Sequence, residues 1–313
     1  GRKILDTGGS SSGSGVSTTS NLAAASLGSE TSGSILSPSS ANSLVGMKPT
    51  IGNVSRAGIV PISSTLDTAG PMTKFVIDNI LIYNAINDFD PLDDYSVENY
   101  DIRLEEVVDS KLEEYTIGYY KSFYERDSLY KNAIDFLTEN GVELQVIDAP
   151  QIRLEGFAKI LDEDMRYDLR SYLFFYGSKN LKVEDISSII KHNEMDSIER
   201  APYGQGIFKK IIQDTMSIND FEDLKFELMN KGNEFFDIPM DKYNLDAVLS
   251  INNYHAGYAA MAHNPCLTVP MKLRKNNEPA GLTIIAKSFQ EQKLYEIGYF
   301  FEKNYMGRIP PKN

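Results

Sequence analysis

The fold of this chain is decided by two loops rich in glycine and hydroxyl residues, T-G-G-S-S-S-G-S-G (Thr7–Gly15) and G-S-E-T-S-G-S-I (Gly28–Ile35). An N-terminus rich in serine and glycine is usually a flexible tail or linker. A linker would not need the apolar, helix-compatible run Asn21–Leu27 between the loops, nor the strand-like V-G-M-K-P (Val45–Pro49) that follows them. The order of these segments therefore predicts a catalytic site.

The two loops resemble those of the amidase signature family of serine amidohydrolases, and in particular its branch of peptide amidases and aryl acylamidases. The family loop G-G-S-S-G-G-S is matched by Gly8–Ser14, with Ser12 in place of a usual glycine. The family loop G-T-D/E-T-G-G-S-I is matched by Gly28–Ile35, with Ser32 in place of a common glycine. The spacing between Ser10 and Ser34 also agrees with that of the family. The resemblance implies an α/β fold with a mixed central β-sheet covered by α-helices on both faces.

The resemblance also implies a mechanism of amide hydrolysis. An amide carbonyl is a poor electrophile, so an attacking serine hydroxyl must lose its proton to a positioned base. By resemblance, Ser34 is this nucleophile and forms an acyl-enzyme that water hydrolyses, while Ser10, on a cis Gly9–Ser10 peptide, relays the proton to a buried lysine. The negative oxygen of the intermediate needs backbone N–H donors. The resemblance assigns them to Thr31, Ser32, Gly33 and Ser34.

The lysine of this mechanism is expected outside the sequence. By the family pattern it lies far upstream of Ser10, whereas Lys3 is too close to the loop and Lys48 matches a position outside the catalytic triad. We therefore expect the chain to begin inside the domain, with the N-terminal segment absent. An alternative stays open, in which a non-catalytic or truncated family member keeps the fold for binding or assembly.

The substrate is indicated by the residue that lies two positions after the nucleophile. Many family members carry an arginine there, which suits an acidic substrate, whereas this chain has Leu36. Leucine favours an uncharged amide, such as a peptide amide, an aryl acylamide or an aliphatic amide. It disfavours the glutaminase subunit of an amidotransferase, which remains an alternative. Tyr203 and Gln205 resemble the variable substrate-binding segment of the family and are expected near the acyl pocket.

The expected organisation is a single domain over residues 1–313. Residues 1–72 hold the catalytic loops, and residues 150–240 form a helical substrate-binding insertion, because their pattern is helical and aromatic. Residues 245–313 supply the C-terminal strands and a closing helix.

Periodicity predicts several elements in the first half of the chain. Apolar residues at helical spacing predict a helix over Met72–Phe89. Asp101–Val107 and Thr116–Tyr119 form a predicted strand region. A helix over Asp127–Asn140 and a strand over Val142–Ile147 follow. A strand, a helix and a strand in this order predict a parallel pair.

The C-terminal part resembles the family again. Leu245–Ser250 reads as a buried strand, and Gly257–Pro270 resembles the family strand A-G-Y-P-A-I-T-V-P. Glu278–Leu294 matches P-x-G-L-Q-F-I-G-x-x-F-x-E, and a final helix is predicted over Glu291–Tyr305.

The composition of the chain excludes some classes of binding partner. The net charge of −13 argues against a nucleic-acid backbone as partner. No apolar run approaches the length of a membrane span. The expected partner is a small-molecule amide, and the sequence leaves open a homodimer and the cellular compartment. The single cysteine, Cys266, cannot form an internal disulfide, and its apolar surroundings predict a buried structural thiol.

Competing kinds of site fit the sequence less well. The three histidines, His192, His255 and His263, lack the spacing of metal ligands, so neither a metal nor another cofactor is expected. A Ser-His-Asp triad using Asp67 or His263 would lack the G-x-S-x-G nucleophile elbow at Ser34.

Overall fold

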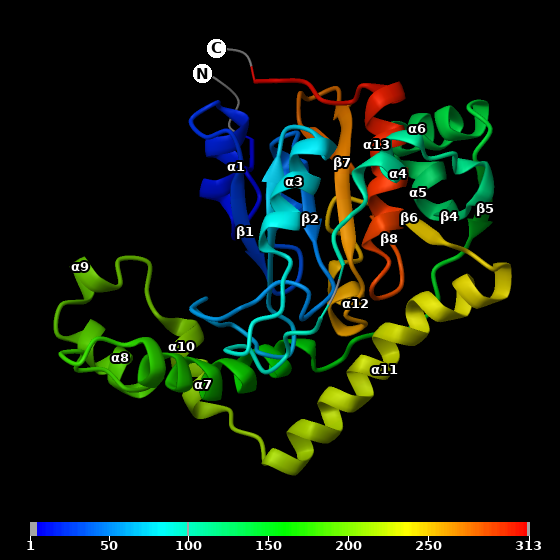
Figure 1. The fold of residues 1–313 in the computed structure, drawn as a ribbon. Helices are drawn as coiled ribbons and strands as arrows, with labels where there is room; N and C mark the ends of the chain where they lie inside the picture. The colour runs from blue at the N-terminus through cyan, green and yellow to red at the C-terminus, as the bar shows by residue number, and fades with distance from the viewer. Residues whose placement is uncertain (1–4, 99, 312–313) are drawn as a thin grey trace.

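A computed structural model describes residues 5–98 and 100–311, and within them the strands form one mixed eight-stranded sheet (Figure 1). The strand order is β1-β3-β2-β7-β8-β6-β4-β5. The strands are β1 (Ser26–Glu30), β2 (Val45–Lys48), β3 (Thr68–Thr73), β4 (Thr116–Tyr120), β5 (Glu143–Ile147), β6 (Ala247–Ile251), β7 (Cys266–Leu273) and β8 (Pro279–Ile285).

The helices of the first half are α1 (Ser12–Thr19), α2 (Leu36–Ala41), α3 (Val76–Ile86), α4 (Leu104–Asp109), the 3₁₀ turn η1 (Leu112–Glu114), α5 (Lys121–Arg126) and α6 (Ser128–Glu139). Those of the second half are α7 (Phe157–Tyr176), α8 (Ile186–Glu194), α9 (Ser197–Arg200), α10 (Gly206–Gln213), α11 (Ile218–Tyr243), α12 (Ala256–Met261) and α13 (Glu291–Tyr305).

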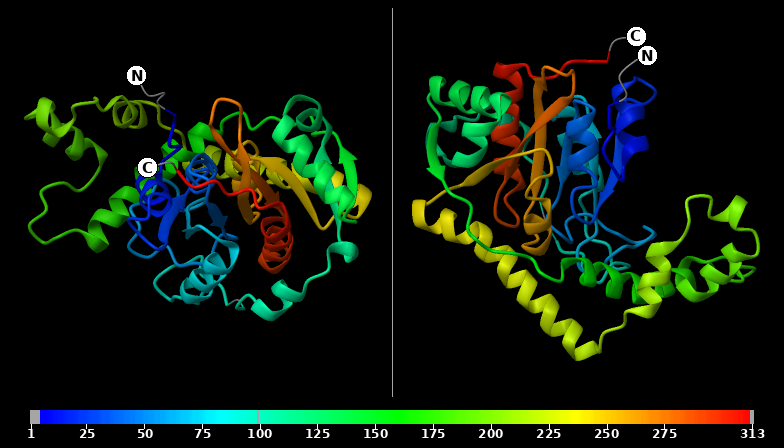
Figure 2. Two further views of the ribbon diagram at one scale, coloured as in Figure 1. Left: turned by 90° about the horizontal axis from the view of Figure 1, so that it is seen from above. Right: turned by 180° about the vertical axis from the view of Figure 1, so that it is seen from behind.

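The sheet is buried on both faces, because alternate residues of its central strands enter two different apolar clusters. In β7, Leu267 and Val269 join the cluster formed with α3, α6 and α13. Their neighbour Cys266 joins the cluster formed with α2, α11 and α12. The left view of Figure 2 shows α3 and α13 on one side of the sheet. The predicted α/β fold with helices on both faces is therefore confirmed.

Directions within the sheet are mixed. The β4 strand pairs in parallel with both β5 and β6, whereas the other pairs are antiparallel. The predicted helix over Asp127–Asn140 is α6, for which Asp127 supplies the N-cap, and it connects the predicted parallel pair. The predicted final helix over Glu291–Tyr305 is α13. These elements were predictable because their apolar spacing and caps are local signals.

Helices α7 to α11 lie at one end of the sheet, and α8, α9 and α10 project to its side (Figure 1). The α11 helix has 26 residues and carries Pro239 within it. Among the helices of residues 5–98 and 100–311, none is long and apolar enough for a membrane crossing.

Two expectations around the glycine loops are wrong. The helix begins within the first loop, as α1, and ends at Thr19, whereas the predicted helix-compatible run Asn21–Leu27 leads into strand β1. The strand β3 includes Met72, so the predicted helix begins later, at Val76. In β3 a Cβ atom on Gly70 would lie 2.0 Å from the carbonyl oxygen of Met47, so only glycine fits between β1 and β2. Such tertiary contacts override local propensity.

Two further predicted strands contain helices. Asp101–Val107 includes the start of α4, in which Leu104 and Val107 follow the i, i+3 spacing of a helix and face the core. Gly257–Pro270 contains most of α12 before β7 begins at Cys266. Cys266 is fully buried and free, as predicted.

Candidate active site

The two glycine loops are in direct contact. The amide of Ser11 donates to the carbonyl oxygen of Ser34 at 3.2 Å. The hydroxyl of Ser11 donates to the carbonyl oxygen of Ser29 at 3.0 Å, and the Ser29 amide donates back to that hydroxyl at 3.1 Å. The Gly9–Ser10 peptide is cis, as the resemblance implied. The structure thus places Ser10 and Ser34 in adjoining segments, with Ser10 exposed and Ser34 half-buried.

Gly8 allows the first loop to approach the second. Its φ is +68°, a conformation that favours glycine. A Cβ atom there would lie 2.7 Å from the backbone nitrogen of Pro38 and 2.7 Å from the carbonyl carbon of Ser37. Because backbone atoms cannot move aside easily, a larger residue would separate the loop from α2.

The second loop is held by the buried carboxylate of Glu30. Its Oε1 accepts the amide of Gly33 at 2.6 Å, and its Oε2 accepts the amides of Ile35 at 2.6 Å and Leu36 at 2.9 Å. These bonds therefore hold the backbone on both sides of Ser34 in the sequence. The carboxylate also lies at the N-terminus of α2, where backbone N–H groups lack helical partners. Burial raises the pKa of Glu30, against the opposing effect of the amides and of Lys48.

One of the amides expected to bind the negative oxygen of the intermediate already donates a hydrogen bond within the protein. The amide of Gly33 donates to Glu30, in contrast to the assignment that the resemblance implied. Within residues 5–98 and 100–311, no acceptor is bonded to the amides of Thr31, Ser32 and Ser34. These three amides, and not that of Gly33, remain available to a negative oxygen.

Gly33 also rests on a distant segment of the chain. Its φ is +98°, and a Cβ atom there would lie 2.8 Å from Nδ2 of Asn253 and 3.5 Å from Cβ of Ala256. The segment between β6 and α12 therefore forms the support of this loop.

A chain of hydrogen bonds connects Thr31 to helix α7. The hydroxyl of Thr31 donates to Oδ1 of Asp67, and Oδ2 of Asp67 accepts the amide of Ser63 at 2.9 Å. The hydroxyl of Ser63 donates to Asp164, and the amide of Ser64 donates to Asp168 at 2.6 Å. Burial raises the pKa of Asp67 and raises the pKa of Asp168 to about 6.

Lys48 lies beneath the loop, and its side chain is fully buried. Its Nζ donates to the carbonyl oxygens of Pro49 at 3.0 Å and Asn264 at 2.8 Å. Burial lowers the pKa of Lys48, against the opposing effects of Cys266 and Glu30. Burial also raises the pKa of Cys266 to about 12, so this thiol stays protonated and is a poor nucleophile.

The expected substrate-binding residues do not gather at the loops. Tyr203 is fully exposed, and Gln205 bonds to Asn193 at 3.0 Å and to the carbonyl oxygen of Ile190 at 3.3 Å. Both precede α10, which lies to the side of the sheet (Figure 1). Leu36 is next to the loop, but its side chain is fully buried in the cluster of α2, α11 and α12.

The histidines differ in their environments. His192 is exposed on α8, His255 is buried and His263 is half-buried. Desolvation lowers the pKa of His255 to about 3 and that of His263 to about 4. In the described part of the chain, no cluster of three or more histidine, cysteine or acidic residues is arranged to hold a metal ion.

Three residues of the site were not predicted as functional: Glu30, Asp67 and Asn253. Glu30 had a signal in the sequence, since an acidic residue shortly before a helix suits the N–H groups of its first turn. Asp67 and Asn253 had none, because their partners lie 36 positions away for Asp67 and at Gly33 for Asn253.

Comparison with known proteins gives matches over most of this chain. A family model described as Amidase matches residues 3–193. A "Probable amidase" of Arabidopsis thaliana is 30% identical, and the match covers 97% of this chain and 61% of the relative. A glutamyl-tRNA(Gln) amidotransferase subunit of Staphylococcus epidermidis is 27% identical, with 95% of this chain and 67% of the relative covered.

Two solved structures are similar over nearly the whole chain. An amidase family protein from Bacillus anthracis superposes with a TM-score of 0.90 at 30% identity, covering 98% of this chain and 62% of that one. Native peptide amidase from Stenotrophomonas maltophilia superposes with a TM-score of 0.87 at 26% identity, covering 98% and 67%. The chain thus spans between 61% and 67% of the length of these four proteins.

Proposed function

This chain belongs to the amidase family, and we propose that it carries the nucleophile of an amidohydrolase that cleaves the C–N bond of an uncharged amide. The observation that carries the proposal is the enclosure of Ser34 by Glu30. The carboxylate binds the amides on both sides of Ser34, and the amide of Ser34 itself has no acceptor within the described residues. A rigid nucleophile with a free amide beside it suits attack on a carbonyl.

In the proposed reaction, the hydroxyl oxygen of Ser34 bonds to the amide carbonyl carbon. Its proton passes to Ser10, which gives its own proton to a general base, and that base later returns the proton to the leaving amine. The carbonyl oxygen becomes negative and accepts hydrogen bonds from the amides of Thr31, Ser32 and Ser34. Each such donor contributes about 3 kcal/mol to a transition state of this kind. The intermediate expels the amine, which takes a proton, and leaves an acyl group on Ser34. Water then releases the carboxylic acid and restores the serine.

The fully buried Leu36 supports an uncharged substrate. Its apolar side chain offers no cation beside the nucleophile, and a leucine cannot replace the bidentate guanidinium that suits a carboxylate. Peptide amides, aryl acylamides and aliphatic amides have no carboxylate at that point. The similarity to peptide amidase supports the first of these classes.

A second candidate is the glutaminase subunit of an amidotransferase. The similarity to the glutamyl-tRNA(Gln) amidotransferase subunit, with 27% identity over 95% of this chain, favours it. Leu36 argues against it for the reason given above. Release of ammonia from glutamine, compared with release from uncharged amides, separates the two candidates.

The test is a panel of uncharged amides, with turnover measured for the full-length protein and for its Ser34→Ala variant. The matched control is Ser20→Ala, an exposed serine at the end of α1. We expect Ser34→Ala to abolish turnover and Ser20→Ala to retain it. Equal turnover in Ser34→Ala would contradict the assignment of the nucleophile. No turnover in any form would favour a non-catalytic role in binding or assembly.

A further inference from the structure

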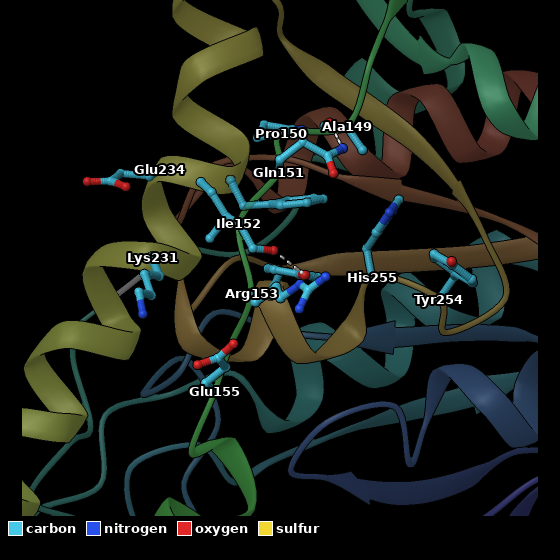
Figure 3. Close-up of a pocket in the computed structure, with 12 residues that line it drawn as sticks. Ala149, Pro150, Gln151, Ile152, Arg153, Glu155, Lys231, Glu234, Tyr254 and His255 are labelled. Atoms are coloured by element: carbon cyan, nitrogen blue, oxygen red, sulfur yellow. Dashed lines mark hydrogen bonds between the residues drawn. The ribbon is translucent and has the colours of Figure 1, made fainter.

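A cavity of about 690 Å³ lies between the segment after β5, helix α11 and the start of α12 (Figure 3). Its volume is within the range of cavities that bind small organic ligands. Figure 3 shows that its walls come from three parts of the chain that are far apart in sequence. The expected residues Tyr203 and Gln205 are not among those that line it.

The cavity adjoins the nucleophile loop through a shared segment. Asn253 and Ala256 are the residues against which Gly33 packs. Tyr254, His255 and Tyr258, which alternate with them along the chain, line the cavity. One short segment therefore supports the loop with some of its residues and forms the cavity wall with others.

The wall of the cavity is aromatic. Phe235 and Tyr258 are stacked, with ring centroids 3.9 Å apart and planes at 17°. Tyr254 meets His255 edge to face, with centroids 5.1 Å apart and planes at 90°. The Tyr254 side chain is 70% exposed, so its ring is available for a further contact. Aromatic rings favour offset-stacked or edge-to-face contacts with a second ring.

The charged side chains of the lining balance one another. Arg153 and Lys231 supply two cations, and Glu155 and Glu234 supply two anions. A lining with no net charge gives neither an anionic nor a cationic ligand an advantage that would offset its desolvation. The balance favours an uncharged ligand.

His255 adds a polar contact without a charge. Its Nδ1 lies 2.9 Å from the hydroxyl oxygen of Ser250, which leaves Nε2 as the ring nitrogen for a ligand. Burial lowers the pKa of His255 to about 3, so the ring is neutral at neutral pH. A neutral imidazole can donate or accept one hydrogen bond at Nε2, according to its tautomer.

We propose that this cavity binds an uncharged aromatic group of the amide substrate, held against Tyr254, His255 and Tyr258. The inference rests on the proposed function, because it takes the ligand to be the substrate of Ser34. It narrows the substrate from uncharged amides in general to those that carry an aromatic ring.

Binding can be tested without turnover in Ser34→Ala. The chain contains no tryptophan, so the fluorescence anisotropy of a tryptophan ligand reports its binding when the ligand is excited at the red edge of its absorption, where tyrosine absorbs little. The probes are N-acetyltryptophanamide, which is uncharged, tryptophanamide, which is a cation, and N-acetyltryptophan, which is an anion. We expect the uncharged probe to bind most tightly. Tyr254→Ala should weaken its binding about five-fold, the effect of one aromatic contact, and Tyr254→Phe should restore it.

The matched control is Tyr176→Ala, a half-exposed tyrosine at the end of α7 that lies outside the cavity lining. Equal affinity in Tyr254→Ala and Tyr176→Ala, tighter binding of either charged probe, or no binding at all would overturn the inference. Cavity-dependent binding of the uncharged probe without turnover by the unmodified chain would support the aromatic site and contradict the proposed function. Turnover that depends on Ser34 without this binding would support the proposed function and contradict the aromatic site.

Discussion

The hydroxyl of Thr31 donates a hydrogen bond to the buried carboxylate of Asp67, although 36 positions separate the two residues in the sequence. This bond holds the side chain of one proposed oxyanion donor. The other oxygen of Asp67 binds the amides of Ile62 and Ser63, so one carboxylate organises both the loop and the turn beside it.

Replacing Asp67 by asparagine should therefore destabilise the protein. The carboxamide has one acceptor oxygen, and its NH₂ group would face the N–H groups of Ile62 and Ser63 or the hydroxyl of Thr31. A buried donor left without an acceptor costs about 1–3 kcal/mol. Urea unfolding measures the loss. Asp94→Asn, at an exposed position, is the control, and an equally small effect in both variants would show that the Asp67 bonds contribute little.

Glu30→Gln should slow amide hydrolysis more than ten-fold while changing KM little. The carboxamide cannot accept all three amide bonds, so the loop around Ser34 would lose its position, and a bond to a charged group contributes about 1.5–3 kcal/mol. Steady-state kinetics on an uncharged amide measures the change. Glu30→Asp keeps the charge and should recover part of the rate.

An exposed position provides the control for Glu30. Glu105→Gln, on the surface of α4, should leave the rate unchanged. Unchanged kinetics in Glu30→Gln itself would show that its carboxylate does not position Ser34.

Gly33→Ala should both destabilise the protein and abolish activity. Gly33 has a φ of +98°, and the new Cβ atom would lie 2.8 Å from Nδ2 of Asn253. Gly58→Ala separates the effect of backbone strain from that of the steric contact, because Gly58 has a φ of +80° but no atom within 4 Å of a new Cβ. Backbone strain alone costs about 1 kcal/mol. Thermal unfolding should show a larger loss for Gly33→Ala, and equal losses would exclude a role for the contact with Asn253.

Asp168 should make the protein less stable as the pH rises. Burial, with Asp164 and Asp67 nearby, raises its pKa from an ordinary value of 3.8 to about 6. The folded state then binds the proton more tightly than the unfolded state does. The stabilisation that protonated Asp168 gives the folded state is fully present below the pKa of the unfolded state. It is lost as the pH rises through about 6. After allowance for partial exposure, we expect about 1–2 kcal/mol.

The measurement is urea unfolding across this pH range for the unmodified protein and for Asp168→Asn. The asparagine can still accept the amide of Ser64 through its oxygen, but it does not titrate. The variant should therefore lose less stability as the pH rises. Parallel profiles for the two proteins would show that another group controls the pH dependence.

The structure explains why some elements were predictable and others were not. The helix α6 and the closing helix α13 follow from local apolar spacing, and α6 also from a capping aspartate. The helix α1 and the strand β3 are rich in serine, glycine or proline, so their propensities oppose their structures. They form because they pack against other elements, α1 against β1 and β3, and β3 between β1 and β2.

The sequence by itself determined the two loops, their glycines and the family resemblance, because these depend on the order and spacing of nearby residues. Only the tertiary structure decided that Glu30 takes the amide of Gly33, that Asp67 holds Thr31, and that Asn253 supports the loop. It also decided that Tyr203 faces solvent and that Tyr254 lines the cavity next to the loop. The physical reason is that these contacts join residues brought together by the packing of the sheet and its helices, and no local pattern records which distant residues will meet.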